Sequence, residues 1–316
     1  MFSLFGLFLV LPLVIIIIAG NILRARGFYS ANDISALMKT LYWVVLPPLL
    51  YYTTYQAGAE ALNQPRLFAA SMICYLLTVV VALVGAIAFV HKGNTGRIAV
   101  SVMACFRSNN VYLGFPVIQL AMGEAGLHQA SICLAVTMVG YQFISLGAGE
   151  IFTSGRLSLR SVKSICKKLV TNPLLVSCVF GVSTAMVGIH LHFVIEEVLK
   201  IMSGAATAIA LLALGGSLDL SRVNKIIGIL RRTWYDTVIK MVICPAIMYV
   251  LLMFFKVPEP LFRVSVMLTA MPTAINTFII ARGMGMDSDY AADLVASATL
   301  TGIVAIPAWA YILHMV

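Results

Sequence analysis

The feature that most constrains this chain is a succession of apolar stretches, each close to the length at which an α-helix crosses a lipid bilayer. At about twenty apolar residues per crossing, the chain divides into ten spans, at roughly 3–23, 33–56, 67–90, 98–122, 129–152, 172–190, 195–217, 233–255, 262–282 and 290–313. A chain in the hydrocarbon layer satisfies its backbone groups only as helices or closed barrels. The pattern therefore predicts an all-α polytopic membrane protein with ten transmembrane helices.

Composition excludes a soluble fold of this size. Hydrophobic residues make up 61% of the 316 residues and charged residues 10%, and the mean hydropathy is +1.00. The formal charge of +9 comes from bases in short loops, where they set membrane orientation, so nucleic acid is not an expected partner. The first stretch lacks a basic n-region and is followed by Arg24 and Arg26. We interpret it as a retained span rather than a signal peptide.

Spans 4 and 9 carry polar residues and helix breakers in their middle: Asn109, Asn110, Gly114, Pro116, Pro272 and Asn276. Proline removes a donor and pushes the preceding residue away from helical angles. We therefore predict an unwound segment over 109–115 and a second short helix beginning at Pro116. Two interrupted hydrophobic segments in corresponding halves are typical of a transporter's binding site.

A basic segment, 154–171, separates two halves of five spans, 1–153 and 172–316, and is expected to form a helix on the membrane surface. Most bases follow odd-numbered spans: Arg24, Arg26, Lys92, Arg97, Arg156, Arg160, Lys163, Lys167, Lys168, Arg222, Lys225, Arg231, Arg232 and Arg282. Even-numbered spans are followed by Arg66, Lys200, Lys256 and Arg263. Odd loops are thus predicted to be cytoplasmic and both termini outside. Five spans per half give the parity of an inverted repeat with two crossing, broken helices.

The ends of broken helices predict the chemistry of this crossing. The start of each second half-helix presents free N–H groups and partial positive charge, which suit a carboxylate. Free carbonyls, amides and hydroxyls suit a cation or the rest of a substrate. The substrate-binding candidates are Asn109, Asn110, Tyr112, Gly114, Pro116, Tyr141, Gln142, Pro272, Thr273, Asn276 and Thr277. The alternative is that these residues only kink two packed helices.

The ionisable residues give weaker indications of the transport mechanism than the broken helices do. All twelve carboxylates fall in loops or within about two turns of a predicted span end, unlike the deep acid expected of a sodium/proton antiporter. Glu150 and Asp293 are the nearest candidates for ion coupling. Asp236 and Lys240, four residues apart, are expected to neutralise each other. Arg107 is expected either to attract an anion or to anchor the helix at the interface.

No catalytic or metal-binding pattern is present in the sequence. The six cysteines are scattered without CxxC spacing, and His190 and His192 have no cysteine or carboxylate beside them. A nucleophile elbow, a P-loop and a dinucleotide fingerprint are absent. We therefore expect neither an enzyme nor a metal or organic cofactor.

Four passages resemble the auxin efflux carrier family of permeases: Ala19 to Gly27 leading to Leu46-Pro47, Arg107 to Leu127, Asn172-Pro173-Leu174, and Met271-Pro272 with Asn276 and Ala281. The resemblance implies the inverted-repeat fold of bile acid:sodium symporters. It also implies a transport domain of spans 3–5 and 8–10 that moves past a scaffold of spans 1, 2, 6 and 7. Because a long central loop is missing, the chain resembles compact bacterial members of the family.

The resemblance further implies small organic anions as substrates, malate- or malonate-like or auxin-like, a bacterial inner membrane location, and a homodimer in which Gly181, Ala185 and Gly188 permit close packing. We predict a secondary transporter of elevator type. The alternatives are a sodium-coupled symporter of a bulkier amphipathic acid, and a channel or receptor. Coupling to sodium or protons and driving by membrane potential all remain open from sequence.

Overall fold

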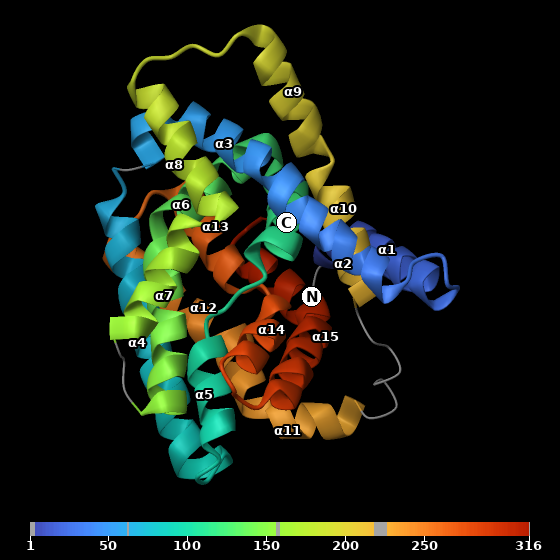
Figure 1. Cartoon of the computed structure of the whole chain (residues 1–316), viewed down its shortest axis with the longest axis vertical. Coiled ribbons are helices and arrows are strands. Elements are labelled where there is room, and N and C mark those ends of the chain that lie inside the picture. The colour runs from blue at the N-terminus through green and yellow to red at the C-terminus, as the bar shows by residue number, and fades with distance from the viewer. Residues whose placement is uncertain (1–3, 62, 156–158, 218–225, 316) are drawn as a thin grey trace.

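The computed structural model describes residues 4–61, 63–155, 159–217 and 226–315, and the regular elements in these ranges are helices (Figure 1). The first group is α1 (Leu4–Ala25), α2 (Ala31–Thr40), α3 (Leu46–Ala57), α4 (Pro65–Gly85), α5 (Thr95–Ala104), α6 (Phe115–Ser154) and α7 (Leu159–Val170). The second is α8 (Pro173–Met186), α9 (Phe193–Gly204), α10 (Ala206–Ser217), α11 (Ile226–Val238), α12 (Cys244–Phe254), α13 (Glu259–Thr269), α14 (Asn276–Gly283) and α15 (Ser288–Ile312).

Six helical segments among the described residues are long and apolar enough to cross a membrane: Ala31–Glu60, Pro65–Val90, Asn110–Thr153, Phe193–Ser217, Ile226–Phe254 and Ser288–Ile312. Three shorter apolar helices are Leu11–Ala25, Thr95–Ala104 and Pro173–Met186. Length and composition therefore confirm the coarser prediction of an all-α polytopic membrane protein.

Single π-helical turns precede three helices that carry proline in their first turn: η1 (Leu41–Val45) before Pro47, η4 (Asn110–Gly114) before Pro116 and η6 (Ile239–Ile243) before Pro245. Proline donates no N–H and its ring crowds the carbonyl one turn earlier. The backbone accommodates this by widening to a π turn and stays helical. At these three positions the chain therefore stays helical up to and through the proline.

The α6 segment is two helices joined at Gly123. This glycine has φ 63° and ψ −153°, a conformation outside the helical region and essentially restricted to glycine. The turn separates a short helix, 115–122, from a long one that continues to Ser154. It falls at the predicted boundary between spans 4 and 5.

The helices α1, α3, α8, α9 and α10 pack as one group, with α1 against α10 and α3 against both α8 and α9. Glycine permits these contacts. A methyl group added at Gly215 would collide with the Ile17 carbonyl, and one at Gly181 would collide with Thr54 and the Tyr51 carbonyl. The expectation that Gly181 serves a dimer contact is therefore wrong, because α3 of the same chain already covers it.

A second group contains α4 to α6 and α11 to α15. Within it α12 packs on α4, α13 on α6, and both α11 and α14 on α15. In the view of Figure 1, α9 lies at the upper end of the molecule, whereas α5 and α11 reach its lower end. The two groups meet where α3 and α1 contact α6 and α15.

The basic segment 154–171, predicted to form a helix on the membrane surface, contains α7. Ile165 and Leu169 are buried on one side of this helix beside Leu146 of α6, and Lys163 and Lys167 are exposed. Its other face is thus polar, as expected of a helix at a membrane surface. Residues 156–158 and 218–225, with Arg156, Arg222 and Lys225 of the charge count, lie outside the described residues.

Candidate functional site

The two interrupted segments meet and pair through their backbones. The Asn109 N–H donates to the Pro272 carbonyl over 2.8 Å, and the Ala274 N–H donates to the Arg107 carbonyl over 2.9 Å. Ser108 and Thr273 form an isolated antiparallel bridge between these bonds. Two short extended segments therefore replace helix where α5, α6, α13 and α14 end or begin.

The first break lies one turn earlier than predicted. The non-helical segment is Cys105–Asn109, and the predicted unwound residues 110–114 form the π turn η4, which continues into α6. The second half-helix thus begins at Asn110 and not at Pro116. Pro116 occupies the first turn of α6, where its missing N–H costs little. The second break, 270–275, contains Pro272 and ends at Asn276, where α14 begins.

A cavity of about 380 Å³ opens beside this crossing. This volume lies in the range of small-molecule sites, about 300–1,000 Å³. The predicted residues that line it are Asn109, Asn110, Tyr112, Tyr141, Gln142 and Asn276. The predicted residues that do not line it are Gly114, Pro116, Pro272, Thr273 and Thr277.

Residues outside the lining have structural positions at the crossing. Gly114 packs so closely on Leu268 and Met271 that an added methyl would clash with them. Pro272 supplies the carbonyl that accepts from Asn109, and one of its ring carbons lies against Gly302 of α15. These residues shape the crossing rather than face the cavity.

Several buried polar atoms around the crossing have no hydrogen-bond partner within the described part of the chain: Arg107 Nε, Asn109 Oδ1, Asn110 Oδ1, Thr273 Oγ1 and Thr277 Oγ1. Leaving a buried donor or acceptor unsatisfied costs about 1–3 kcal/mol. Such a concentration in one place is expected of groups arranged to bind a polar ligand. Arg107, Asn109 and Asn110 among them also line the cavity.

Arg107 also lines the cavity, although it is not among the substrate-binding residues predicted from the sequence. Its side chain is only 1% exposed, and Nη1 donates to Gln142 Oε1 and to Ser145 Oγ, each over 3.0 Å. The guanidinium also lies over the Tyr141 ring, 5.3 Å from its centroid. An arginine beside a predicted helix break was the available signal, but its burial depends on packing against α6.

The cavity is suited to an anion. Among the described residues that line it, those with a charge are Lys39 and Arg107. The N-terminus of α14 begins at Asn276, another lining residue, and adds partial positive charge. A buried guanidinium recognises a carboxylate strongly through paired N–H donors.

The predicted coupling acids do not line this cavity. Asp293 Oδ2 pairs with Arg232 Nη1 over 2.7 Å on the α11–α15 seam, and Glu150 lies half-buried in α6. The prediction for Asp236 is wrong in two respects. The helix begins at Ile226, seven residues before the predicted span, so Asp236 lies in its interior and is fully buried. Its partners are Ser101 and Tyr290, whereas Lys240 Nζ donates to the Thr269 carbonyl.

Comparison with known proteins identifies the family. The family model described as "Membrane transport protein" matches residues 153–310, which is half of the chain. The chain belongs to this family, which is that of the auxin efflux carriers. The resemblance inferred from sequence motifs is thereby confirmed, and the family indicates a membrane transporter rather than an enzyme.

Relatives extend over nearly the whole transporter. An uncharacterized transporter of Methanothermobacter thermautotrophicus is 25% identical over 96% of this chain and 97% of its own. A putative malonate transporter of Rhizobium meliloti is 23% identical, with 97% and 95% covered. Auxin efflux carrier component 5 of Arabidopsis thaliana is 22% identical over 87% of each chain. The similarity includes both interrupted segments.

Proposed function

We propose that this protein is a secondary transporter of small carboxylates and that the cavity at the helix crossing is its substrate site. The observation that carries the proposal is the buried Arg107 beside the unpaired polar atoms of Asn109 and Asn110. A small carboxylate would accept from the guanidinium and from the start of α14. The names of two relatives, a putative malonate transporter and an auxin efflux carrier, support this substrate class.

An inverted repeat of ten crossings accounts for the packing. Such a repeat relates α1 to α8 and α3 to α10, so the contact of α1 with α10 has its counterpart in that of α3 with α8. It likewise relates the contact of α13 with α6 to that of α5 with α15. We propose that α1, α3 and α8 to α10 form a scaffold. The remaining membrane helices carry the cavity past it in an elevator motion.

The rim of the cavity favours an inward-facing state. Ser35 and Lys39 line the cavity as exposed residues of α2, with Lys39 in the last turn of that helix, and Asn172 lies between α7 and α8. Ser35 and Asn172 lie near the starts of predicted spans 2 and 6, next to loops after odd-numbered spans, which the positive-inside rule assigns to the cytoplasm. We therefore propose a cytoplasmic opening, both termini outside, and residence in a prokaryotic cytoplasmic membrane.

The sodium-coupled symporter of a bulkier acid has less support. The volume of about 380 Å³ suits a small acid. In addition, the Lys240 ammonium donates over 2.6 Å to the Thr269 carbonyl at the end of α13, a position where a coupling cation would otherwise find a ligand. We therefore expect carboxylate binding that does not require sodium.

The test is ligand-induced stabilisation of the purified protein. We expect malonate or a related small carboxylate to raise the unfolding temperature, because a ligand at one hundred times its dissociation constant adds about 2.7 kcal/mol to stability. Asn109→Ala should abolish this shift and malonate uptake into proteoliposomes. Asn63→Ala, an exposed asparagine between α3 and α4, is the matched control. Wild-type shifts and uptake in the Asn109 variant would refute the site assignment.

A further inference from the structure

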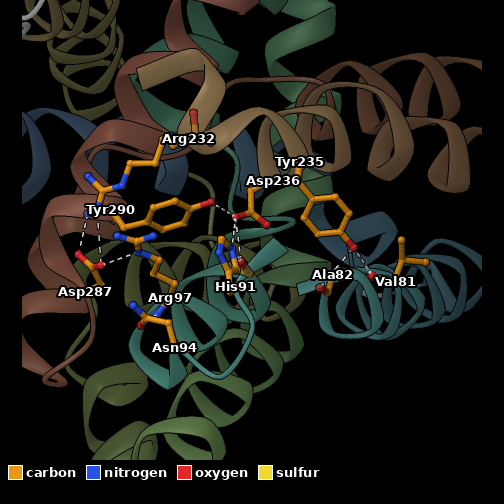
Figure 2. Close-up of polar contacts among 12 residues, drawn as sticks. Val81, Ala82, His91, Asn94, Arg97, Arg232, Tyr235, Asp236, Asp287 and Tyr290 are labelled. Atoms are coloured by element: carbon orange, nitrogen blue, oxygen red, sulfur yellow. Dashed lines mark hydrogen bonds and ion pairs between the residues drawn. The ribbon is translucent and has the colours of Figure 1, made fainter. Parts of the chain in front are cut away.

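A second polar centre lies inside the group of α4–α6 and α11–α15, away from the cavity lining (Figure 2). Its central residue is Asp236 of α11, which is fully buried. Ser101 Oγ of α5 donates to Asp236 Oδ2 over 2.8 Å, and the Tyr290 hydroxyl of α15 donates to the same oxygen. His91 Nε2 lies 3.4 Å from Oδ2 and 3.0 Å from Ser101 Oγ. Residues from two other parts of the chain, 91–101 and 290, thus converge on the carboxylate of Asp236.

The two oxygens of the Asp236 carboxylate differ in their hydrogen-bond partners. All of these contacts are made by Oδ2, whereas Oδ1 has no hydrogen-bond partner in the described residues although it is buried. An ionised carboxylate with a bare, buried oxygen carries a considerable desolvation cost. A proton on Oδ1 would remove the charge and leave the contacts of Oδ2 in place. The geometry is therefore compatible with both the charged and the neutral state.

A polar route connects this centre to the protein surface. The guanidinium groups of Arg97 and Arg232 lie over the Tyr290 ring, 5.6 and 5.5 Å from its centroid. Both contact Asp287 Oδ2, at 3.0 and 3.5 Å. The side chains of Arg97 and Asp287 are 34% and 22% exposed. Figure 2 shows this chain of side chains leading from Asp287 to Asp236. In the proposed orientation, it faces the cytoplasm.

A second connection leads from this centre to the substrate crossing. Lys240 lies one turn after Asp236, is fully buried, and donates to the Thr269 carbonyl. Ser108 Oγ, in the first unwound segment, donates to the same carbonyl over 3.2 Å. Asp236 and Lys240 do not bond to each other, but they lie one turn apart on one continuous helical segment, so an ionised Asp236 lowers the positive potential at Lys240 and a neutral Asp236 does not. Protonation of Asp236 therefore makes the crossing more positive and favours an anion there.

We propose that Asp236 is the proton-binding site of this transporter and that one proton moves with each carboxylate. An O–H bond forms at Asp236 Oδ1 with a proton from water on one side of the membrane. The same bond breaks when the proton passes to water on the other side. His91, Ser101 and Tyr290 are positioning residues for the carboxylate. This inference rests on the proposed function as a carboxylate transporter, and it makes that transporter a proton symporter.

Other titratable or charged groups around Asp236 come from every element packed there: His91, Arg97, Cys105, Arg232, Tyr235, Lys240, Asp287, Tyr290 and Asp293. Arg97 forms an ion pair with Asp287, and Arg232 forms one with Asp293. The Tyr235 hydroxyl points away from Asp236 and donates to the Val81 carbonyl. Asp236 is the member of this set that combines complete burial with an unpaired oxygen.

The test measures malonate affinity and uptake as a function of pH with the full chain. Because substrate and proton bind cooperatively, affinity should rise as pH falls, by up to about tenfold per pH unit for one linked proton. Asp236→Asn imitates the neutral state. It should bind malonate with an affinity that lacks this pH dependence and exchange malonate across the membrane, yet fail to accumulate it against a proton gradient. Asp289→Asn, an exposed acid on α15, should behave as wild type.

Tyr290→Phe is the second variant, because it keeps the carboxylate and removes one donor to Oδ2. Loss of that donor disfavours the ionised form, so the pH dependence of binding should persist and move to higher pH. A purely structural role for the cluster predicts no such displacement. An Asp236→Asn variant that still accumulates malonate with a proton gradient, or wild-type binding that is independent of pH, would overturn this inference and leave the proposed function intact. If the wild type binds no malonate at any pH, both this inference and the proposed function are overturned.

Discussion

Arg107 carries the positive charge that the proposed substrate requires, and its environment is specific to arginine. Its guanidinium reaches Gln142 and Ser145 while lying on Tyr141, a combination that lysine cannot reproduce. We predict that Arg107→Ala weakens malonate binding about 10- to 150-fold, the equivalent of about 1.5–3 kcal/mol for hydrogen bonds to a charged group. Arg107→Lys should retain part of the affinity.

Calorimetric titration of malonate into the purified protein measures this effect. Arg26→Ala removes an exposed arginine next to α1 and serves as the control for net charge. Equal losses in the Arg26 and Arg107 variants would mean that general electrostatic attraction, and not the buried guanidinium, accounts for binding.

Asp287 links acid stability to the surface end of the polar route. Burial disfavours its ionised form, but the hydrogen bonds from the Tyr290 N–H and from Arg97, with the charge of Arg232, outweigh that effect and lower the pKa of its carboxyl. A pKa lower in the folded than in the unfolded state stabilises the protein above the ordinary aspartate range. This contribution disappears as pH falls through the lowered pKa.

We therefore predict that Asp287→Asn has a flatter decline of unfolding temperature between neutral and acid pH than the wild type. Asparagine still caps α15, so the helix start is preserved and the charge alone is removed. Thermal unfolding in detergent over a pH series checks this. Parallel curves for the two proteins would contradict the prediction.

Residues also mark the limit of sequence reasoning. Asn109 and Asn276 were predictable as site residues, because an amide inside an apolar span is visible as an anomaly in the sequence. Arg107 and Asp236 were not, because Arg107 stands beside a predicted helix break, where it could equally serve as an interfacial anchor, and Asp236 stands near a predicted span end, where charge is ordinary. Their complete burial results from packing against α6 and α15, which single-sequence periodicity does not report.

At the scale of elements, the sequence indicated which spans are interrupted, but the structural effect of Pro116 was predicted wrongly. Pro116 was expected to unwind the preceding residues, yet a π turn absorbs its effect and the break falls at Cys105–Asn109. The extended backbone there is stabilised by pairing with 272–274. Because the pairing joins segments more than 160 residues apart in sequence, local propensity alone could not locate it.

Gly123 permits the sharp turn that separates the short helix of the crossing from the rest of α6. No atom lies within 4 Å of a methyl added there, so a substitution tests backbone conformation alone. We predict that Gly123→Ala costs about 1–3 kcal/mol, because the φ and ψ values of this residue are accessible essentially to glycine only. It should also impair transport by displacing the start of α6.

The matched control is Gly228→Ala in α11. A methyl at Gly228 also meets open space, but the backbone there is helical, so alanine should be neutral or slightly stabilising. Chemical denaturation in detergent compares the two variants. Similar stabilities would show that the backbone at position 123 relaxes without cost.

At the scale of the whole molecule, pairwise packing supports the inverted repeat more strongly than any local similarity between the halves. The sequence offered parity and loop charge. The fold adds reciprocal contacts, α1 with α10 and α3 with α8, between elements that the repeat would interchange. Several of the counted loop bases also have structural partners: Arg24 donates to the Gly216 carbonyl, and Arg97 and Arg232 bind Asp287. Some of the basic residues that predict membrane orientation therefore also stabilise the packing of the helices.

The crossing of α8 decides whether the two halves have opposite orientations. At 14 residues, α8 is shorter than the six helical segments that qualify by length, and it is the shortest unbroken crossing of the proposed ten-span topology. Exposed residues flank it on both sides, among them Lys163 of α7 before it and His190 after it. If α8 spans the membrane, cysteines at these two positions face opposite compartments.

We predict that, in a Cys166→Ser background that removes the exposed natural thiol, Lys163→Cys reacts with a membrane-impermeant maleimide only in inside-out vesicles. His190→Cys should react only in right-side-out vesicles. The remaining cysteines are buried and should stay unlabelled in both. Labelling of both positions from the same side would mean that α8 does not cross, which leaves the halves with equal orientation and removes the basis for an inverted repeat. Opposite labelling would require α8 to cross as a short, tilted or locally solvated helix, consistent with its place against α3 in the scaffold.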